Sequence, residues 1–148
     1  MRIVLSTVKE ASVTIDEKVY SSIKQGYLLL VGFTFGDNKE VVDKMAEKII
    51  NLRVFQDENG KTNKSLFDVK GEILSVSQFT LYASIKGSRR PSFTNALTPL
   101  EAEELYKYFN DKIKEKYGDV KTGIFGADMK VYSINDGPFT LMIDSKEL

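Results

Sequence analysis

Apolar runs divide the first part of the chain into expected strands. The segments RIVLSTV (2–8), ASVTID (11–16) and YLLLVGF (27–33) are rich in β-branched and apolar residues, and Lys9-Glu10 and Gln25-Gly26 separate them. The run from 27 to 33 is apolar without alternation. We therefore expect it to be a central strand that is covered on both faces.

Two later segments have the period of a helix. In the first, Asp37 is the expected N-cap and Glu40 follows three residues later, as in a capping box. Its apolar stripe consists of Val41, Val42, Met45, Ala46, Ile49 and Leu52. In the second, Thr98 is the expected N-cap, Pro99 the first helical residue and Gly118 the residue after the C-terminus. Its stripe consists of Ala102, Leu105, Phe109 and Ile113.

The remaining strand-like segments complete one domain. RVFQDENGKTN (53–63) contains an Asn59-Gly60 turn, which is typical of a hairpin. GEILSVSQFTLYA (71–83) is the longest expected strand, and ADMKVYSI (127–134) and FTLMID (139–144) are expected to be two more. Neither a repeat nor a linker divides the chain. The pattern predicts a single domain over residues 1–148, of the mixed α/β (α+β) class, with a curved sheet and two principal helices.

The tetrapeptide Asn135-Asp136-Gly137-Pro138 interrupts the last strand-like segments. Asx residues and glycine favour a turn, so one interpretation is the connection of a hairpin. A second interpretation is that the peptide belongs to a binding site, because glycine lets the backbone approach a ligand closely.

Composition narrows the functional classes. The chain is 42% hydrophobic and 28% charged, which is typical of a compact soluble domain. Its 21 basic and 21 acidic residues cancel, which argues against a protein that coats nucleic acid non-specifically. The longest apolar run is far shorter than the roughly 20 residues of a membrane span, and the N-terminus does not resemble a secretory signal. We therefore expect a cytoplasmic protein.

The chain contains neither cysteine nor histidine. Their absence excludes disulfides, thiol catalysis, Ser-His nucleophiles and zinc sites built on these residues. We expect neither a metal nor a cofactor. An enzyme with this sequence has to use carboxylates, lysine, tyrosine, main-chain dipoles or the substrate's own groups.

Four segments place polar residues where a plain core does not need them. Ser77-Gln78-Phe79-Thr80-Leu81 lies within the longest expected strand, and its mixed alternation suits either a cleft wall or a solvent-facing side. The segment 86–93 contains Arg89 and Arg90, which suit either an exposed loop or a phosphate clamp.

The third segment is 123–129, in which two glycines permit close approach and Phe125 and Met129 could pack against a planar base. The alternative is a loop with a core phenylalanine. The fourth segment runs from Asn135 to Thr140.

Together these segments resemble a known family. SQFTL (77–81), RPSF (90–93), FGADM (125–129) and NDGPFT (135–140), in this order and spacing, resemble the D-aminoacyl-tRNA deacylase family, and the resemblance extends along essentially the whole chain. It implies curved, barrel-like sheets and a homodimer. It also implies hydrolysis of the ester between a D-amino acid and the 3′-terminal adenosine of tRNA, a proofreading step that uses the RNA's own 2′-hydroxyl and no metal.

The resemblance also implies roles for individual residues. The catalytic segment is Ser77, Gln78, Phe79 and Thr80, where main-chain N–H groups stabilise an oxyanion, a contribution of about 3 kcal/mol per good donor. Gly137 and Pro138 form a Gly-cisPro chirality filter that reaches into the partner's active site, rejects L side chains and lets glycyl esters through. The implied substrate-binding residues are Asn135, Thr140, Phe125, Gly126, Ala127 and Met129. Arg89 and Arg90 are the implied phosphate contacts.

The chain departs from the family pattern at two places. Ser6-Thr7 stands where the family commonly has Gln-Arg, an arginine that helps to orient the Gly-Pro peptide, and SIKGSR (84–89) differs from the usual loop. Either another residue supports the peptide or the filter is looser. The alternatives are an editing deacylase with altered amino-acid specificity, a non-catalytic module that binds the 3′ end of tRNA, and a dimer that binds a small molecule.

Overall fold

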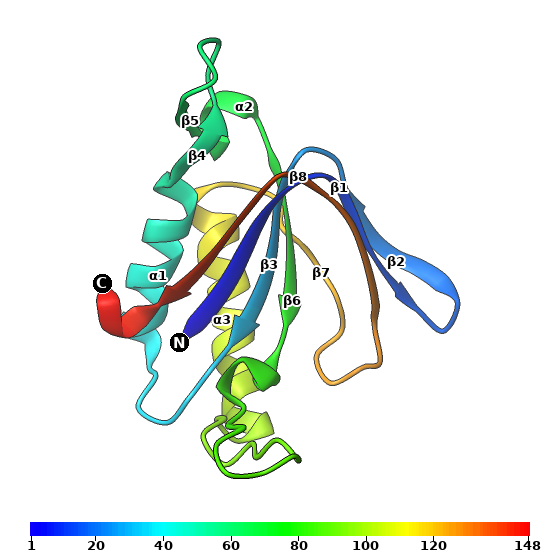
Figure 1. The fold of residues 1–148 in the computed structure, drawn as a ribbon, viewed down its shortest axis with the longest axis vertical. Coiled ribbons are helices and arrows are strands. Elements are labelled where there is room, and N and C mark those ends of the chain that lie inside the picture. The colour runs from blue at the N-terminus through cyan, green and yellow to red at the C-terminus, as the bar shows by residue number, and fades with distance from the viewer.

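The computed structural model describes residues 1–148 as one curved sheet with helices packed against it and a small hairpin at one end (Figure 1). The strands are β1 (Arg2–Ile15), β2 (Lys18–Ile23), β3 (Gly26–Gly32), β4 (Arg53–Gln56), β5 (Thr62–Ser65), β6 (Glu72–Ser77), β7 (Lys121–Thr122) and β8 (Lys130–Asp144). The helices are α1 (Lys39–Asn51), α2 (Leu66–Val69) and α3 (Pro99–Lys116), with short 3₁₀ turns η1 (Phe79–Tyr82) and η2 (Ser145–Glu147).

The main sheet is ordered β2-β1-β3-β6-β7, and β8 pairs with β1. β1 is antiparallel to β2, β3 and β8, whereas β3, β6 and β7 are parallel to one another. β1 and β8 arch together over the molecule, so that one half of β1 lies beside β3 and the other half beside β2 (Figure 1). This bend gives the expected mixed α/β fold with a nearly closed, barrel-like sheet.

Each face of the sheet has its own core. On one face, odd-numbered residues of β1 and β3 pack against α1 and α3, which accounts for the buried side chains of Ile3, Leu5, Leu29, Met45 and Phe109. On the other face, the curled sheet covers a smaller cluster that consists of Val8, Ala11, Val13, Ile23, Leu28, Leu74 and Val76. The expectation that residues 27–33 are covered on both faces is confirmed.

The start of α1 differs from the prediction. Asn38, and not Asp37, is the N-cap, and its side chain accepts a hydrogen bond from the Val41 amide at 3.1 Å. Asp37 instead accepts hydrogen bonds from the Met1 amino group at 2.6 Å and from the Thr34 amide at 2.8 Å. The buried stripe of α1 is Val42, Met45, Ala46, Ile49 and Ile50.

The start of α3 agrees with the prediction, with Thr98 at the N-cap and Pro99 at the first helical position. The buried stripe contains Tyr106 in addition to Ala102, Phe109 and Ile113, and Leu105 is only partly buried. The short helix α2 was not expected. None of the helices combines the length and the hydropathy that a membrane crossing requires.

The segment 71–83 is not one long strand. β6 ends at Ser77, and residues 79–82 form η1. Its neighbour β3 ends at Gly32, and the last paired residues of the two strands are Val31 and Ser77. Beyond that point the backbone has no strand to pair with, so it turns into a local 3₁₀ structure.

The hairpin interpretation of residues 135–138 is also wrong. β8 is a single strand of 15 residues that runs through this peptide, and β1 likewise continues through Lys9-Glu10. The pairing of β1 with β8 is irregular beside the peptide, so residues 136–139 form a bulge and not a turn. In contrast, the Asn59-Gly60 hairpin is confirmed, because β4 and β5 pair on either side of it.

Candidate active site

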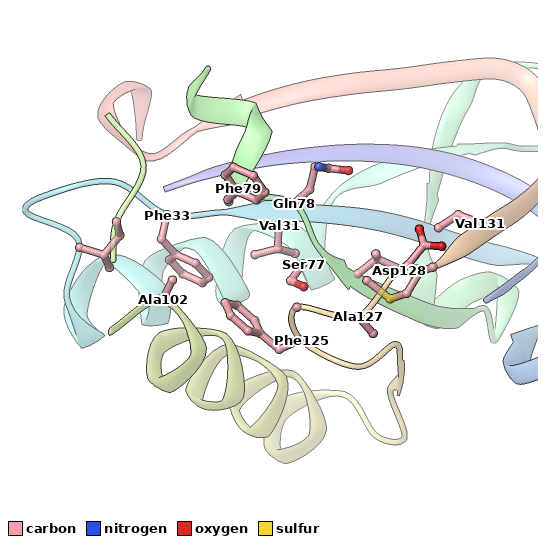
Figure 2. Close-up of a pocket in the computed structure, with 15 residues that line it drawn as sticks. Val31, Phe33, Ser77, Gln78, Phe79, Ala102, Phe125, Ala127, Asp128 and Val131 are labelled. Atoms are coloured by element: carbon pink, nitrogen blue, oxygen red, sulfur yellow. The ribbon is translucent and has the colours of Figure 1, made fainter. Parts of the chain in front are cut away.

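A cavity of about 300 Å³ lies where β3 and β6 end, between these strands, α3 and the segment that leads into β8 (Figure 2). This volume is at the lower end of the range for small-molecule sites. The lining residues are Val31, Gly32, Phe33, Val76, Ser77, Gln78, Phe79, Leu97, Ala102, Phe125, Gly126, Ala127, Asp128, Met129 and Val131. The cavity therefore brings together two of the motifs, 77–79 and 125–129.

The position of η1 depends on a close approach between two backbones. The Gln78 amide donates to the Val31 carbonyl at 2.7 Å, and this bond follows directly after the last strand pair. A Cβ on Gly32 would lie 2.7 Å from the Gln78 carbonyl oxygen. A side chain at Gly32 would thus push η1 away from β3. A glycine inside an apolar run is the sequence signal for such an approach.

Aromatic contact joins a third motif to this site. The rings of Phe79 and Phe93 meet edge to face, with their centroids 5.0 Å apart. Thr80 is exposed and does not line the cavity, but its hydroxyl accepts a hydrogen bond from the Gln78 side-chain amide at 2.5 Å. In Figure 2 the side chain of Ser77 is directed toward Phe125, whereas that of Gln78 points away from it.

The far wall of the cavity is held by α3. The Tyr106 hydroxyl donates to the Ser75 carbonyl at 2.8 Å, and its ring lies 6.0 Å from that of Phe125. Burial raises the pKa of Tyr106, so the phenol stays neutral and keeps its proton for this bond. Phe125 is thereby backed by a fixed side chain. The wall suits a planar apolar group.

The other predicted site residues do not line this cavity. Arg89 and Arg90 lie in the exposed loop that connects η1 to α3, and Asn135, Gly137, Pro138 and Thr140 lie along the exposed part of β8. Within one chain, therefore, the NDGPFT motif and the cavity are separate.

The Gly137-Pro138 peptide bond is cis. Gly137 has a φ of +130°, and a Cβ there would lie 2.8 Å from the Phe139 nitrogen, so this position requires glycine. Thr7, which stands where the family commonly has arginine, donates to the Asp136 carbonyl at 2.8 Å.

Sequence reasoning missed the apolar lining residues, above all Val31, Phe33, Leu97 and Ala102. An apolar side chain that lines a cavity has the same sequence pattern as one in the core, so no signal distinguished them. Asp128 is the one acidic side chain of the lining, and it pairs with Lys130 at 2.8 Å. The chain has no group of three or more side chains arranged to hold a metal ion.

Comparison with known proteins places the chain among deacylases. It is 54% identical over 144 residues to a D-aminoacyl-tRNA deacylase of Lactobacillus gasseri, with 97% of this chain and 99% of that protein covered. It is 52% identical over 148 residues to one of Aquifex aeolicus, with 100% of both covered.

Solved structures agree. A protein called c-Myc DNA Unwinding Element Binding Protein is 39% identical, with a TM-score of 0.92 over 97% of this chain and 98% of that one. A probable eukaryotic D-amino acid tRNA deacylase shares the fold at 17% identity, with a TM-score of 0.84 over 96% of this chain and 97% of that one. The model of the D-Tyr-tRNA(Tyr) deacylase family matches residues 4–144, and together with relatives more than half identical over nearly the whole chain it shows that this chain belongs to that family.

Proposed function

We propose that this chain hydrolyses the ester of D-aminoacyl-tRNA to a free D-amino acid and tRNA, a proofreading step in translation. The observation that carries the proposal is the cavity in which residues 77–79 meet residues 125–129, in a chain whose relatives are named D-aminoacyl-tRNA deacylase. Because tRNA is a component of translation, we expect the activity in the cytoplasm.

The cavity offers different surroundings to the two parts of the substrate. Phe125 and Met129 supply an apolar wall for the terminal adenine, with Gly126 and Ala127 at its edge. The ester then lies beside Ser77–Thr80. The first amides of a helical turn have no acceptor within the turn, so the N–H groups of Phe79 and Thr80 are suited to an oxyanion.

The chemistry needs little from the side chains. Water adds through its oxygen to the ester carbonyl carbon and gives up a proton, the bond from that carbon to the ribose oxygen breaks, and the ribose oxygen takes a proton. The chain has no histidine, so we assign proton transfer to water and to the terminal 2′-hydroxyl of the RNA, as the family resemblance implies. The protein contributes orientation and main-chain dipoles.

We further propose a homodimer in which Gly137 and Pro138 complete the partner's cavity. β8 pairs with β1 along one edge only, and its other edge has no strand beside it. Apolar side chains are exposed along it, at Tyr132, Ile134 and Met142. Proteins normally bury a long apolar edge strand against another segment, and in symmetric oligomers that segment belongs to a second copy of the chain.

In that dimer the peptide at Gly137 acts as a chirality filter. The backbone can come near the substrate Cα because Gly137 has no side chain. Fixed main-chain atoms there collide with an L side chain and leave room for a D side chain, while Asn135 and Thr140 contact the substrate. Selection by exclusion accepts many D side chains, and it also accepts glycyl esters.

Arg89 and Arg90 are our candidates for contacts with nearby phosphates, since both lie in an exposed loop and neither forms an ion pair within the chain. The name of one structural relative refers to DNA. The formal net charge of zero favours a local contact at an RNA end over the broad basic surface that duplex DNA requires.

The test compares single-turnover hydrolysis of D-tyrosyl-, glycyl- and L-tyrosyl-tRNA with a chelator present. We expect rapid loss of the D and glycyl esters and an intact L ester. Loss of all three esters indicates an editing enzyme with a looser filter. Binding without hydrolysis of any ester indicates a tRNA-end sensor, and neither binding nor hydrolysis contradicts the proposal.

A further inference from the structure

The pairing of β1 with β8 has a gap at the Gly-Pro peptide. Ser6 pairs with Thr140 and Val8 with Asn135, so a single residue of β1, Thr7, faces the four residues 136–139 of β8. These four residues form a long bulge, and none of them has a ladder partner on β1. Their orientation depends on contacts other than the regular strand ladder.

Two buried hydroxyl groups of β1 hold the ends of this bulge. Thr7 Oγ1 donates to the Asp136 carbonyl at 2.8 Å, and the hydroxyls of Ser6 and Thr140 share a hydrogen bond of 3.0 Å. Ser6 is 8% exposed and Thr7 is 4% exposed, whereas residues 136–138 are exposed. The exposed bulge is therefore held by hydrogen bonds to two buried hydroxyl groups.

We propose that Thr7 is a positioning residue that sets how strictly the site separates D from L substrates. The Asp136 carbonyl and the Gly137 amide belong to one planar peptide group. A hydrogen bond that holds the carbonyl oxygen therefore also directs the Gly137 N–H and the backbone that follows it. This inference rests on the proposed function, because it assigns the filter to that backbone.

Threonine is suited to this role because its χ1 is restricted. A β-branched side chain has few rotamers, so the hydroxyl of Thr7 keeps its direction toward Asp136. Valine has the same shape without the donor, and serine has the donor with a freer χ1. Comparing threonine with valine at position 7 tests the hydrogen bond at constant packing, and comparing threonine with serine tests the orientation of the hydroxyl.

The experiment measures single-turnover rates on D-tyrosyl- and L-tyrosyl-tRNA for the wild type, Thr7→Val and Thr7→Ser. We expect Thr7→Val to reduce the ratio of D to L rates about tenfold, mainly through faster loss of the L ester, and Thr7→Ser to restore most of the ratio. Thr14→Val is the matched control, because Thr14 lies in the same strand opposite Lys130, away from the bulge. A ratio that Thr7→Val leaves unchanged overturns the proposal.

A second measurement tests the positioning role of Thr7 independently of any hydrolysis. Nuclear magnetic resonance relaxation of the Gly137 amide reports the mobility of the peptide without any substrate. We expect greater mobility in Thr7→Val than in the wild type and in Thr14→Val, with melting temperatures that stay close. Equal mobility in all three overturns the role of Thr7. If the wild type hydrolyses no ester while Gly137 responds to Thr7→Val, the positioning role stands and the proposed function fails.

Discussion

At the scale of single residues, Thr80 occupies the second position of η1, directly after Phe79 of the cavity wall, and its hydroxyl accepts a hydrogen bond from the Gln78 side chain. Its side chain is exposed, so the core does not depend on it. We propose that the Thr80 side chain orients the substrate, in addition to the role of its amide at the oxyanion.

We therefore expect Thr80→Ala to reduce single-turnover hydrolysis of D-tyrosyl-tRNA on the order of tenfold to a hundredfold, because orientation is lost. The melting temperature should change little. Thr80→Ser keeps the hydroxyl and should retain most of the rate. An unchanged rate in Thr80→Ala would remove this side chain from the site.

The N-cap of α1 was predicted incorrectly because two neighbouring residues both suit that position. Asp37 and Asn38 are both good N-caps, and the pattern selected the wrong one. The choice is made by the Met1 amino group, which lies 36 positions away in the chain and binds Asp37 at 2.6 Å. No local pattern contains that contact.

At the scale of elements, η1 depends on a residue from the start of β1. The guanidinium of Arg2 donates to the Leu81 carbonyl at 3.0 Å and to the Asp144 carboxylate at 2.8 Å, and it lies 4.7 Å from the centre of the Tyr82 ring. One side chain thus ties η1 to β1 and to the end of β8. These contacts explain why a turn of only four residues is fixed beside the cavity.

The Arg2–Asp144 pair gives a pH dependence. Burial raises the pKa of Asp144, but hydrogen bonds from the Arg2 side chain and the Lys146 amide outweigh burial, so the pKa is lower than usual. The charged carboxylate then stabilises the fold above its unfolded pKa of about 3.9, and this stability is lost as the pH falls through the folded pKa.

We expect the wild type to have a higher urea midpoint than Asp144→Asn above about pH 5, and the difference to shrink below about pH 4. Asp119→Asn is the control, because the pKa of Asp119 is also lowered, by Lys121, but its side chain is 69% exposed. Screening by water should make its effect small at every pH. A pH-independent difference for Asp144→Asn would contradict this account.

At the scale of the whole molecule, the cavity and the proposed filter are separate within one chain. In the dimer that we propose, a second copy covers β8 and Gly137 completes the partner's cavity. We expect Ile134→Lys, alone or with Met142→Lys, to convert a dimer to a monomer in analytical ultracentrifugation and to abolish most D-ester hydrolysis, because charge on an apolar interface is costly.

Leu100→Lys provides the matched control. Leu100 is 72% exposed and lies in the first turn of α3, so the same charge is added away from β8. This variant should keep both its mass in solution and its activity. A monomeric Ile134→Lys protein with full activity would show that each chain is complete by itself and that Gly137 does not act across an interface.

The elements that were predicted well have local causes. Thr98 and Pro99 define the start of α3, and the Asn59-Gly60 turn defines the β4–β5 hairpin, through bonds and dihedral angles within a few residues. The motifs at 77–80 and 125–129 were also recognisable in order. That they meet in one cavity follows from the parallel pairing of β3 with β6 and from α3 behind them, which are long-range contacts.

The sequence by itself thus determines that this domain combines helices and strands. Because it contains no histidine, it also determines that any catalysis proceeds without one, and it carries the motifs that identify the family. Tertiary contacts determine where β6 gives way to η1, because β3 ends there and offers no further partner. They also determine that Asp136-Gly137-Pro138 is a bulge and not a hairpin, because β1 continues beside it and Thr7 holds it. The sequence pattern reflects near neighbours, whereas strand register and support depend on residues far apart in the chain: β3 pairs with β6 46 positions away, and β1 pairs with β8 more than a hundred positions away.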